Sequence, residues 1–203
     1  MILGQIEDGD LLLRALRPDS DDLGNYLTWM SSPSRNPFIV SAKENFSRDE
    51  LIRYLHEVNQ SSDAVQFAIF NRDEGEASHI GNIKFHDLSV SSKTCFVGFL
   101  IGEEAWRGKG LANRAFELGA LLILKEFDIR TFKLGVDSAN SSAVRAYEKM
   151  GFRVVGTNGS ANFMMELDSG HLVPGQNASR ANQKPLYPPL AAWRNPLDGG
   201  GSS

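Results

Sequence analysis

Two glycines separated by one residue, Gly108 and Gly110, stand between an apolar run and the start of a long apolar segment. Glycine lets the backbone bend tightly and approach a ligand closely, because it has no Cβ atom. The first amides of a helix have no partner within the helix and lie at the positive end of its dipole, so they can bind an anion. Arg107 and Lys109 add positive charge beside them. Segment 107–112 therefore predicts a turn that binds a pyrophosphate.

The glycines alone would also fit an ordinary tight turn, so the assignment depends on further residues. Neither G-x-x-x-x-G-K-[ST] nor G-x-G-x-x-G is present, which excludes two other phosphate-binding loops. A second segment, 140–152, contains Asn140 and Tyr147 and ends in Gly151-Phe152. Tyr147 follows Asn140 by seven residues, or about two helical turns, so a helix starting at Asn140 can direct Tyr147 back toward a bound ligand.

With these two segments the chain resembles the GNAT superfamily of N-acetyltransferases. Residues 107–112 match the R-x-x-G-x-A cofactor signature at every defined position, and Asn140 and the run 147–152 match the second signature at a normal distance. The resemblance covers about residues 10–168. Segments 79–84 and 101–106, and Trp29 with Pro33, are similar to the branch that contains ribosomal-protein N-terminal and nucleotide-aminosugar acetyltransferases. Arg107 departs from that branch, which often carries tryptophan there.

The resemblance implies direct acetyl transfer from acetyl-CoA, as co-substrate, to an amine in a ternary complex, with no metal. It implies a cofactor site made of the end of one strand, the glycine turn and the second motif: Leu100, Ile101, Arg107, Gly108, Lys109, Gly110, Leu111, Ala112 and Asn140. An amide near Leu100 or Ile101 is expected to stabilise the developing oxyanion. The edge of the strand is expected to pair with the pantetheine arm, as peptides pair with sheet edges.

The chemical roles can be assigned from what amine acetylation requires. Tyr147 is the candidate acid for the leaving thiolate, and a core tyrosine is the alternative interpretation. Asn140 suits both an amide contact with the pantetheine arm and a helix N-cap. We predict Glu104 as the general base, although a free amine acceptor needs no strong base. Four residues at strand ends stay open for that role: Glu103, Glu104, His86 and Asp87.

Periodicity and turn residues predict the elements that must position these side chains. Strands are expected at 10–17, 65–70, 80–85, 94–102, 132–136, 152–156 and 163–167. Helices are expected from the acidic segment 19–22 to about residue 30, and at 47–60, 110–127 and 141–150. This order predicts an α/β (α+β) GNAT-type fold, with a mixed, mostly antiparallel seven-stranded sheet flanked by about four helices.

Composition limits the class of protein and its partners. The chain has 203 residues, 41% of them hydrophobic, which suits one acetyltransferase domain at 1–168 and a flexible tail rich in Gly, Pro, Asn and Ser at 169–203. A net charge of -4 disfavours nucleic acid as the main partner. Cys95 is the single cysteine and is expected in the core. With no apolar segment long enough for a membrane span, a cytoplasmic location is predicted.

Three functions remain in competition. The leading hypothesis is acetylation of a small amine, such as an amino sugar nucleotide, and the second is acetylation of a protein N-terminus. The third, from another class, is an acyl-CoA-binding sensor or interaction module without turnover. A small-molecule or peptide amine is therefore the expected partner, with a homodimer as an open option, and neither nucleic acid nor membrane is expected.

Overall fold

The computed structural model describes residues 1–34, 42–73, 76–159 and 161–172. Its strands form one eight-stranded sheet in the order β1-β2-β3-β4-β5-β6-β8-β7. Neighbouring strands are antiparallel, apart from the parallel pair β5 and β6. The strand bounds are β1 (Ile6–Asp8), β2 (Leu11–Arg14), β3 (Val65–Asp73), β4 (Glu76–Ser89), β5 (Thr94–Ile101), β6 (Thr131–Asp137), β7 (Arg153–Asn158) and β8 (Asn162–Asp168).

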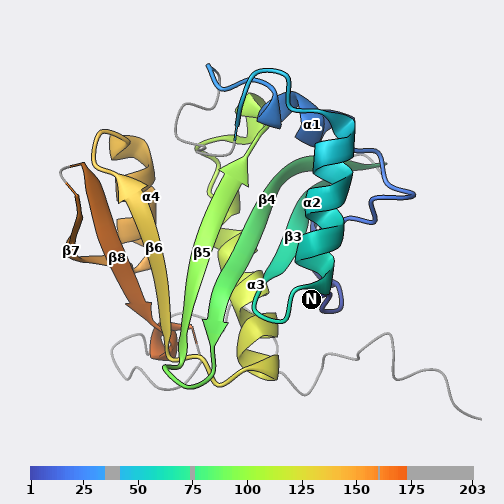
Figure 1. The fold of residues 1–203 in the computed structure, drawn as a ribbon. Helices are drawn as coiled ribbons and strands as arrows, with labels where there is room; N and C mark the ends of the chain where they lie inside the picture. The colour runs from blue at the N-terminus through green and yellow to red at the C-terminus, as the bar shows by residue number, and fades with distance from the viewer. Residues whose placement is uncertain (35–41, 74–75, 160, 173–203) are drawn as a thin grey trace, which may run out of the picture.

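Helices cover both faces of this sheet (Figure 1). On one face, α1 (Gly24–Met30) and α2 (Arg48–Gln60) enclose a smaller core that includes Leu12, Leu51 and Phe70. On the other face, α3 (Leu111–Glu126) and α4 (Ser141–Met150) pack on the main core, which includes Phe85 and Phe116. Two 3-10 turns complete the described chain, η1 (Glu104–Trp106) and η2 (Ser169–His171).

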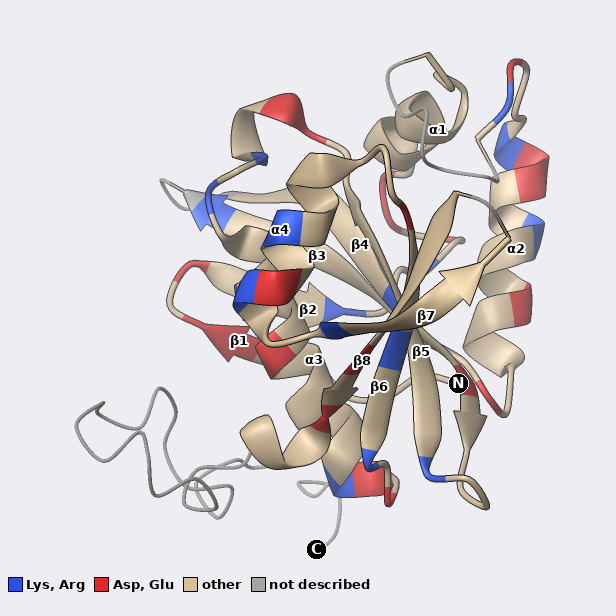
Figure 2. Ribbon diagram, turned by 90° about the vertical axis from the view of Figure 1, so that its left-hand side faces the viewer, with Lys and Arg blue, Asp and Glu red and all other residues tan. Residues whose placement is uncertain are grey.

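Local sequence signals account for where these helices begin and end. Ser47 caps α2 through a capping box, since its hydroxyl accepts from the Glu50 amide while the Glu50 carboxylate accepts from the Ser47 amide. Gly151 ends α4 in the left-handed conformation at φ 101°. Basic and acidic residues are interspersed on α2 and α4, whereas the charged residues of β1 are all acidic (Figure 2).

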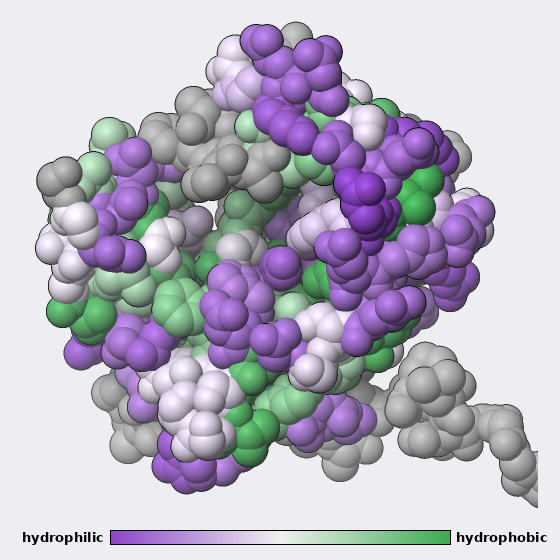
Figure 3. All heavy atoms as spheres, viewed as in Figure 1, coloured by the Kyte–Doolittle hydropathy of each residue, from purple (hydrophilic) through white to green (hydrophobic). Residues whose placement is uncertain are grey.

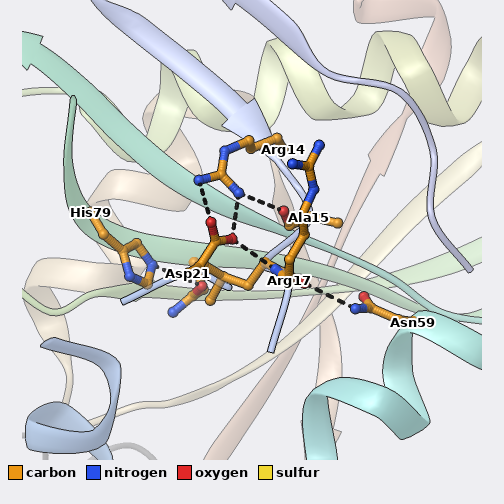
Figure 4. Close-up of polar contacts among 8 residues, drawn as sticks. Arg14, Ala15, Arg17, Asp21, Asn59 and His79 are labelled. Carbon is orange, nitrogen blue, oxygen red and sulfur yellow. Dashed lines mark hydrogen bonds and ion pairs between the residues drawn. The ribbon is translucent and has the colours of Figure 1, made fainter. Parts of the chain in front are cut away.

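Two expectations about the N-terminal part differ from the structure. The sheet has eight strands rather than seven, because Ile6–Asp8 pairs with β2 as an additional edge strand. The first helix begins at Gly24, not directly after Pro18. Asp21 is used in a turn instead: its carboxylate accepts from the Arg14 guanidinium at 2.6 and 3.0 Å and from the Arg17 amide at 2.7 Å (Figure 4).

The end of the described chain extends the body slightly. Ser169–His171 forms η2, the Ser169 amide donates to the Arg130 carbonyl, and Leu172 packs on the main core. The rest of the predicted tail, 173–203, lies outside the described residues. Within the described chain, no helix has the length and apolar character needed to cross a membrane.

Candidate functional site

The parallel strands β5 and β6 separate toward one end of the sheet. They pair only at Thr94–Phe96, opposite Thr131–Lys133, so β5 is bonded to β4 alone from Val97 to Ile101. Figure 1 shows the two strands diverging upward, and Figure 3 shows the surface hollowed in the same region. One edge of a central strand is therefore left without a strand partner, although central strands normally pair on both sides.

The direction of the peptide groups along β5 follows from one hydrogen bond. The Gly102 amide donates to the Ile80 carbonyl of β4 at 3.0 Å. Because peptide groups of successive residues point to opposite sides of a strand, those of Ile101 and Phe99 face the opening toward β6. Those of Leu100 face β4, where Leu100 pairs with Asn82. Of the two residues expected to supply an oxyanion donor, Ile101 therefore presents its amide to the opening.

The glycine turn lies directly after this open end. Gly108 and Gly110 have φ angles of 72° and 78°, a region that side-chain-bearing residues rarely adopt, and Gly110 is the N-cap of α3. In the described part of the chain, no protein acceptor is found for the amides of residues 108–112. A Cβ atom built at either glycine would meet nothing within 4 Å. The turn thus presents unpaired amides to open space at the start of a 16-residue helix.

The two basic side chains of the turn behave differently from each other. Arg107 Nε donates to the Ile101 carbonyl at 2.9 Å and an Arg107 terminal nitrogen donates to the Gly102 carbonyl at 3.2 Å. Its guanidinium therefore holds the turn against the end of β5, a role that the sequence did not predict. Lys109 lies over the Trp106 ring with its nitrogen 4.5 Å from the centroid, so its charge stays beside the exposed turn.

Asn140 is the N-cap of α4. Its side-chain oxygen accepts from the Ala143 amide at 3.2 Å and from the Ser142 hydroxyl at 3.0 Å. The N-cap interpretation is therefore confirmed, while the Asn140 amide nitrogen is not used in these two bonds. Ser142 and Ala143 thus both contact the Asn140 side chain at the start of α4.

Tyr147 lies on the inner side of α4, against residues of the neighbouring elements. Its ring centroid is 5.3 Å from that of Phe99 on β5 and 6.2 Å from that of Phe152. Burial raises the pKa of Tyr147 to about 12, so the phenol keeps its proton at neutral pH. The structure therefore brings Tyr147 to β5 from the far side of the opening.

The four candidate bases separate into two groups. Glu103 and Glu104 follow β5 at its open end, with Glu103 half-buried and Glu104 exposed in η1. His86 pairs with Phe96 at the closed end, where β5 and β6 are still bonded, and Asp87 follows it. The structure thus keeps the two glutamates beside the opening and places His86 and Asp87 away from it.

The remaining titratable candidates lie outside the opening. Burial raises the pKa of the Cys95 thiol to about 12, so this core cysteine is not activated as a nucleophile. His79 is buried between α1 and the sheet, where its ring contacts Trp29 and Phe70. Among the described residues, no group of three or more His, Cys, Asp or Glu side chains is arranged to hold a metal.

Sequence reasoning missed one contact at this end of β5. Trp29 donates its indole N–H to the Glu103 carboxylate at 3.1 Å, and Gly102 lies against the same indole ring. The sequence marked Trp29 as part of a first-helix pattern. It gave no signal that a residue more than seventy positions away accepts its hydrogen bond.

Comparison with known proteins agrees with this geometry. The sequence matches the family model for the acetyltransferase (GNAT) domain over residues 10–153. The chain belongs to the GNAT acetyltransferase family. This GNAT protein is therefore an enzyme of the acetyltransferase class, and the predicted family and fold class are confirmed. Comparison with curated protein sequences gave no match.

Solved structures share the fold of this GNAT enzyme. Spermidine N-acetyltransferase from Vibrio cholerae, in complex with CoA and spermine, has 19% identity and a TM-score of 0.68 over 80% of this chain and 98% of that chain. Microcin C7 self-immunity acetyltransferase MccE, with acetyl-CoA and AMP, has 12% identity and a TM-score of 0.67 over 79% and 93%. Ribosomal L7/L12 alpha-N-protein acetyltransferase, with coenzyme A, has 16% identity and a TM-score of 0.66 over 79% and 95%.

Proposed function

We propose that this enzyme transfers the acetyl group of acetyl-CoA to the nitrogen of a small amine by direct attack in a ternary complex. The observation that carries the proposal is the unpaired edge of β5 running into a turn of unpaired amides. The unpaired edge of β5 fits an extended chain that contains amides, such as the pantetheine arm of CoA. The turn of unpaired amides fits the diphosphate of CoA. Tyr147 lies beside the same opening, as such a reaction requires.

The residues present suit CoA along the whole opening. The amides of residues 108–112, with the charge of Lys109, would hold the pyrophosphate. Phe99 would bond the pantetheine arm through its gap-facing peptide group, and Leu100 would line the arm from the same strand. Asn140 would offer its amide nitrogen to the arm while its oxygen caps α4. We assign the oxyanion donor to the Ile101 amide, because it points into the opening.

The pKa of Tyr147 determines whether its hydroxyl transfers a proton to the leaving thiolate or donates a hydrogen bond to it. A phenol with a pKa of about 12 does not give up its proton to a thiolate whose thiol has a pKa of about 8.5. It can donate a hydrogen bond to the sulfur as the C–S bond breaks and the C–N bond forms. The amine loses one proton and the sulfur gains one, so Glu103 or Glu104, with water, would carry the proton between them.

The open face beside β5 favours an amine that also carries a negative charge. Gly98 lies opposite Lys84 on β4, and a Cβ at Gly98 would meet nothing within 4 Å, which leaves room for a ligand there. Lys84 is half-buried, with its nitrogen 5.1 Å from the Tyr54 ring centroid. Burial lowers the pKa of Lys84, while the charges of Asp87 and Asp63 raise it.

A phosphate would compensate this partly desolvated ammonium better than a polyamine would. No carboxylate of the described chain lies within ion-pair distance of Lys84. Lys84 and Gly98 thus support an amino sugar nucleotide as the acceptor. A protein N-terminus remains the alternative acceptor, and an acyl-CoA sensor without turnover remains the alternative of another class.

Thiol release from acetyl-CoA tests the proposal directly. We expect release with a UDP-linked amino sugar, and slower release with the matching free amino sugar, with spermidine and with peptides that have a free N-terminus. Lys84→Met is expected to raise KM for the nucleotide sugar by tenfold or more and to leave KM for the free sugar unchanged. Tight CoA binding with no thiol release from any acceptor would instead support the sensor.

A further inference from the structure

We propose that Glu103 accepts the proton of the amine and that Trp29 is its positioning residue, acting through the indole N–H. The inference rests on the proposed acetyl transfer and names the residue that serves as base in that same site. Its basis is a hydrogen bond of 3.1 Å from Trp29 Nε1 to Glu103 Oε1, which joins α1 to the open end of β5. A donor that is fixed before the reaction can hold a carboxylate in one orientation, whereas a solvated carboxylate samples many orientations.

The indole of Trp29 is held in place from several sides. Trp29 is 4% exposed, and its ring centroid is 4.9 Å from that of His79 on β4 and 6.1 Å from that of Tyr26. A Cβ at Gly102 would lie 2.0 Å from the indole, so only glycine lets the ring rest against the end of β5. The absence of a side chain at Gly102 and the burial of the Trp29 ring together fix the position of the indole.

The main chain of Glu103 is fixed as firmly as its carboxylate. Its amide donates to the Ile80 carbonyl of β4 at 3.3 Å, and its carbonyl accepts from the Trp106 amide at 3.0 Å. Glu104, by contrast, is exposed in η1. Glu103 follows Ile101 by two residues, so a carboxylate with a fixed backbone and a fixed oxygen lies next to the predicted oxyanion donor.

The hydrogen bond from Trp29 engages one oxygen of the Glu103 carboxylate and leaves the other oxygen for the amine. Trp29 adds no charge of its own to the contact, because an indole N–H is a neutral donor. Ionisable side chains on the adjoining segments include Tyr26 on α1, His79 on β4, Glu104 in η1 and Arg107 after it. Burial lowers the pKa of His79, and Arg107 is bound to the Ile101 and Gly102 carbonyls.

Indole NMR tests the contact without any acceptor. In protein labelled with ¹⁵N-tryptophan, Trp29→Phe assigns one of the three indole N–H signals. We expect the Trp29 signal to shift with pH in one transition that disappears in Glu103→Gln and persists in the exposed-site control Glu44→Gln. Persistence of the transition in Glu103→Gln, or its loss in Glu104→Gln alone, would overturn the proposal.

Kinetics then separate positioning from packing. With the UDP-linked amino sugar as probe, Glu103→Gln is expected to lower kcat about 100-fold or more with KM for acetyl-CoA unchanged. Trp29→Phe keeps an aromatic ring on Gly102 but removes the N–H, so kcat is expected to fall about tenfold with KM for acetyl-CoA unchanged. A Trp29→Phe variant with a lower Tm and an unchanged kcat would show packing alone and would refute the positioning role.

Different outcomes would refute the proposed acetyl transfer and the role of Glu103 as its base. Absence of thiol release with every acceptor counts against the proposed reaction. A normal rate in Glu103→Gln counts against Glu103 as the base while the reaction itself stands.

Discussion

The ring of Tyr147 packs against the ring of Phe99 with their centroids 5.3 Å apart, so α4 contacts β5 across the opening between β5 and β6. Phe99 is also one of the residues whose peptide groups face that opening. The contact therefore fixes the phenol relative to the strand edge that we assign to the pantetheine arm. Rings at this separation and tilt are in ordinary aromatic contact, which keeps α4 in place without a strand bridging the gap.

Removing the Tyr147 hydroxyl isolates its chemical contribution. Tyr147→Phe is expected to lower kcat tenfold or more, because the sulfur loses a hydrogen-bond donor as the C–S bond breaks. The affinity for CoA and the Tm should scarcely change, since the Phe ring keeps the contacts with Phe99 and Phe152. Thiol-release kinetics and calorimetric CoA titration measure the two effects. An unchanged kcat would remove Tyr147 from catalysis.

A branched side chain at Gly110 tests the glycine turn. Gly110→Val would place its side chain in the open space in front of the unpaired amides, so loss of CoA binding is expected in calorimetry. Backbone strain at φ 78° is a second effect, costing about 1–3 kcal/mol. Gly159→Val is the matched control, because Gly159 has φ 73° and open space too but lies in the β7–β8 turn.

The two variants should lose similar stability. Only Gly110→Val should lose CoA affinity. Normal affinity in that variant would refute the assignment of the phosphate site to this turn.

Local signals in the sequence predicted most elements, because their causes are local. The capping box at Ser47 and the glycine at 151 fixed the start of α2 and the end of α4. The glycine turn and Asn140 carried their family motifs, so the open end of the sheet could be located before any coordinates were known. These features need only a few consecutive residues to form.

The features that could not be predicted are side-chain contacts that form only in the folded chain. Asp21 looked like an N-terminal helix residue, but its bonds to Arg14 and Arg17 place it in a turn instead. Arg107 was predicted at the phosphate site for its charge, but its hydrogen bonds to the carbonyls at the end of β5 were not foreseen. Propensity states what a segment prefers in isolation, and such tertiary partners override it.

Adding a methyl group to Gly102 tests whether the indole of Trp29 needs that space. Gly102→Ala is expected to be destabilising by about 1–3 kcal/mol, because the new Cβ would overlap the ring and force it to move. Gly98→Ala on β5 should have a Tm close to that of the unmodified protein, since its Cβ would meet nothing within 4 Å. Equal Tm values for the two variants would contradict the packing of Trp29 on Gly102.

The Asp21 carboxylate should make stability depend on pH in a defined direction. Burial alone would raise the pKa of Asp21, but hydrogen bonds from Arg14 and the Arg17 amide together hold it below its ordinary value. A carboxyl group whose pKa is lower in the folded state stabilises the fold above its unfolded pKa, and that contribution is lost as pH falls through the folded pKa. Asp21→Asn is therefore expected to lower the free energy of unfolding at pH 7 by about 1–3 kcal/mol.

Denaturant unfolding of Asp21→Asn at several pH values checks this sign. The deficit relative to the unmodified protein should shrink as the pH is lowered, because the protonated aspartic acid and the asparagine are then both neutral. Asp19→Asn is the matched control: the Asp19 side chain is 82% exposed and lies 3.6 Å from the His56 ring nitrogen, so its removal should change little. A deficit in Asp21→Asn that stays constant down to acidic pH would show that the Asn side chain disturbs packing rather than charge.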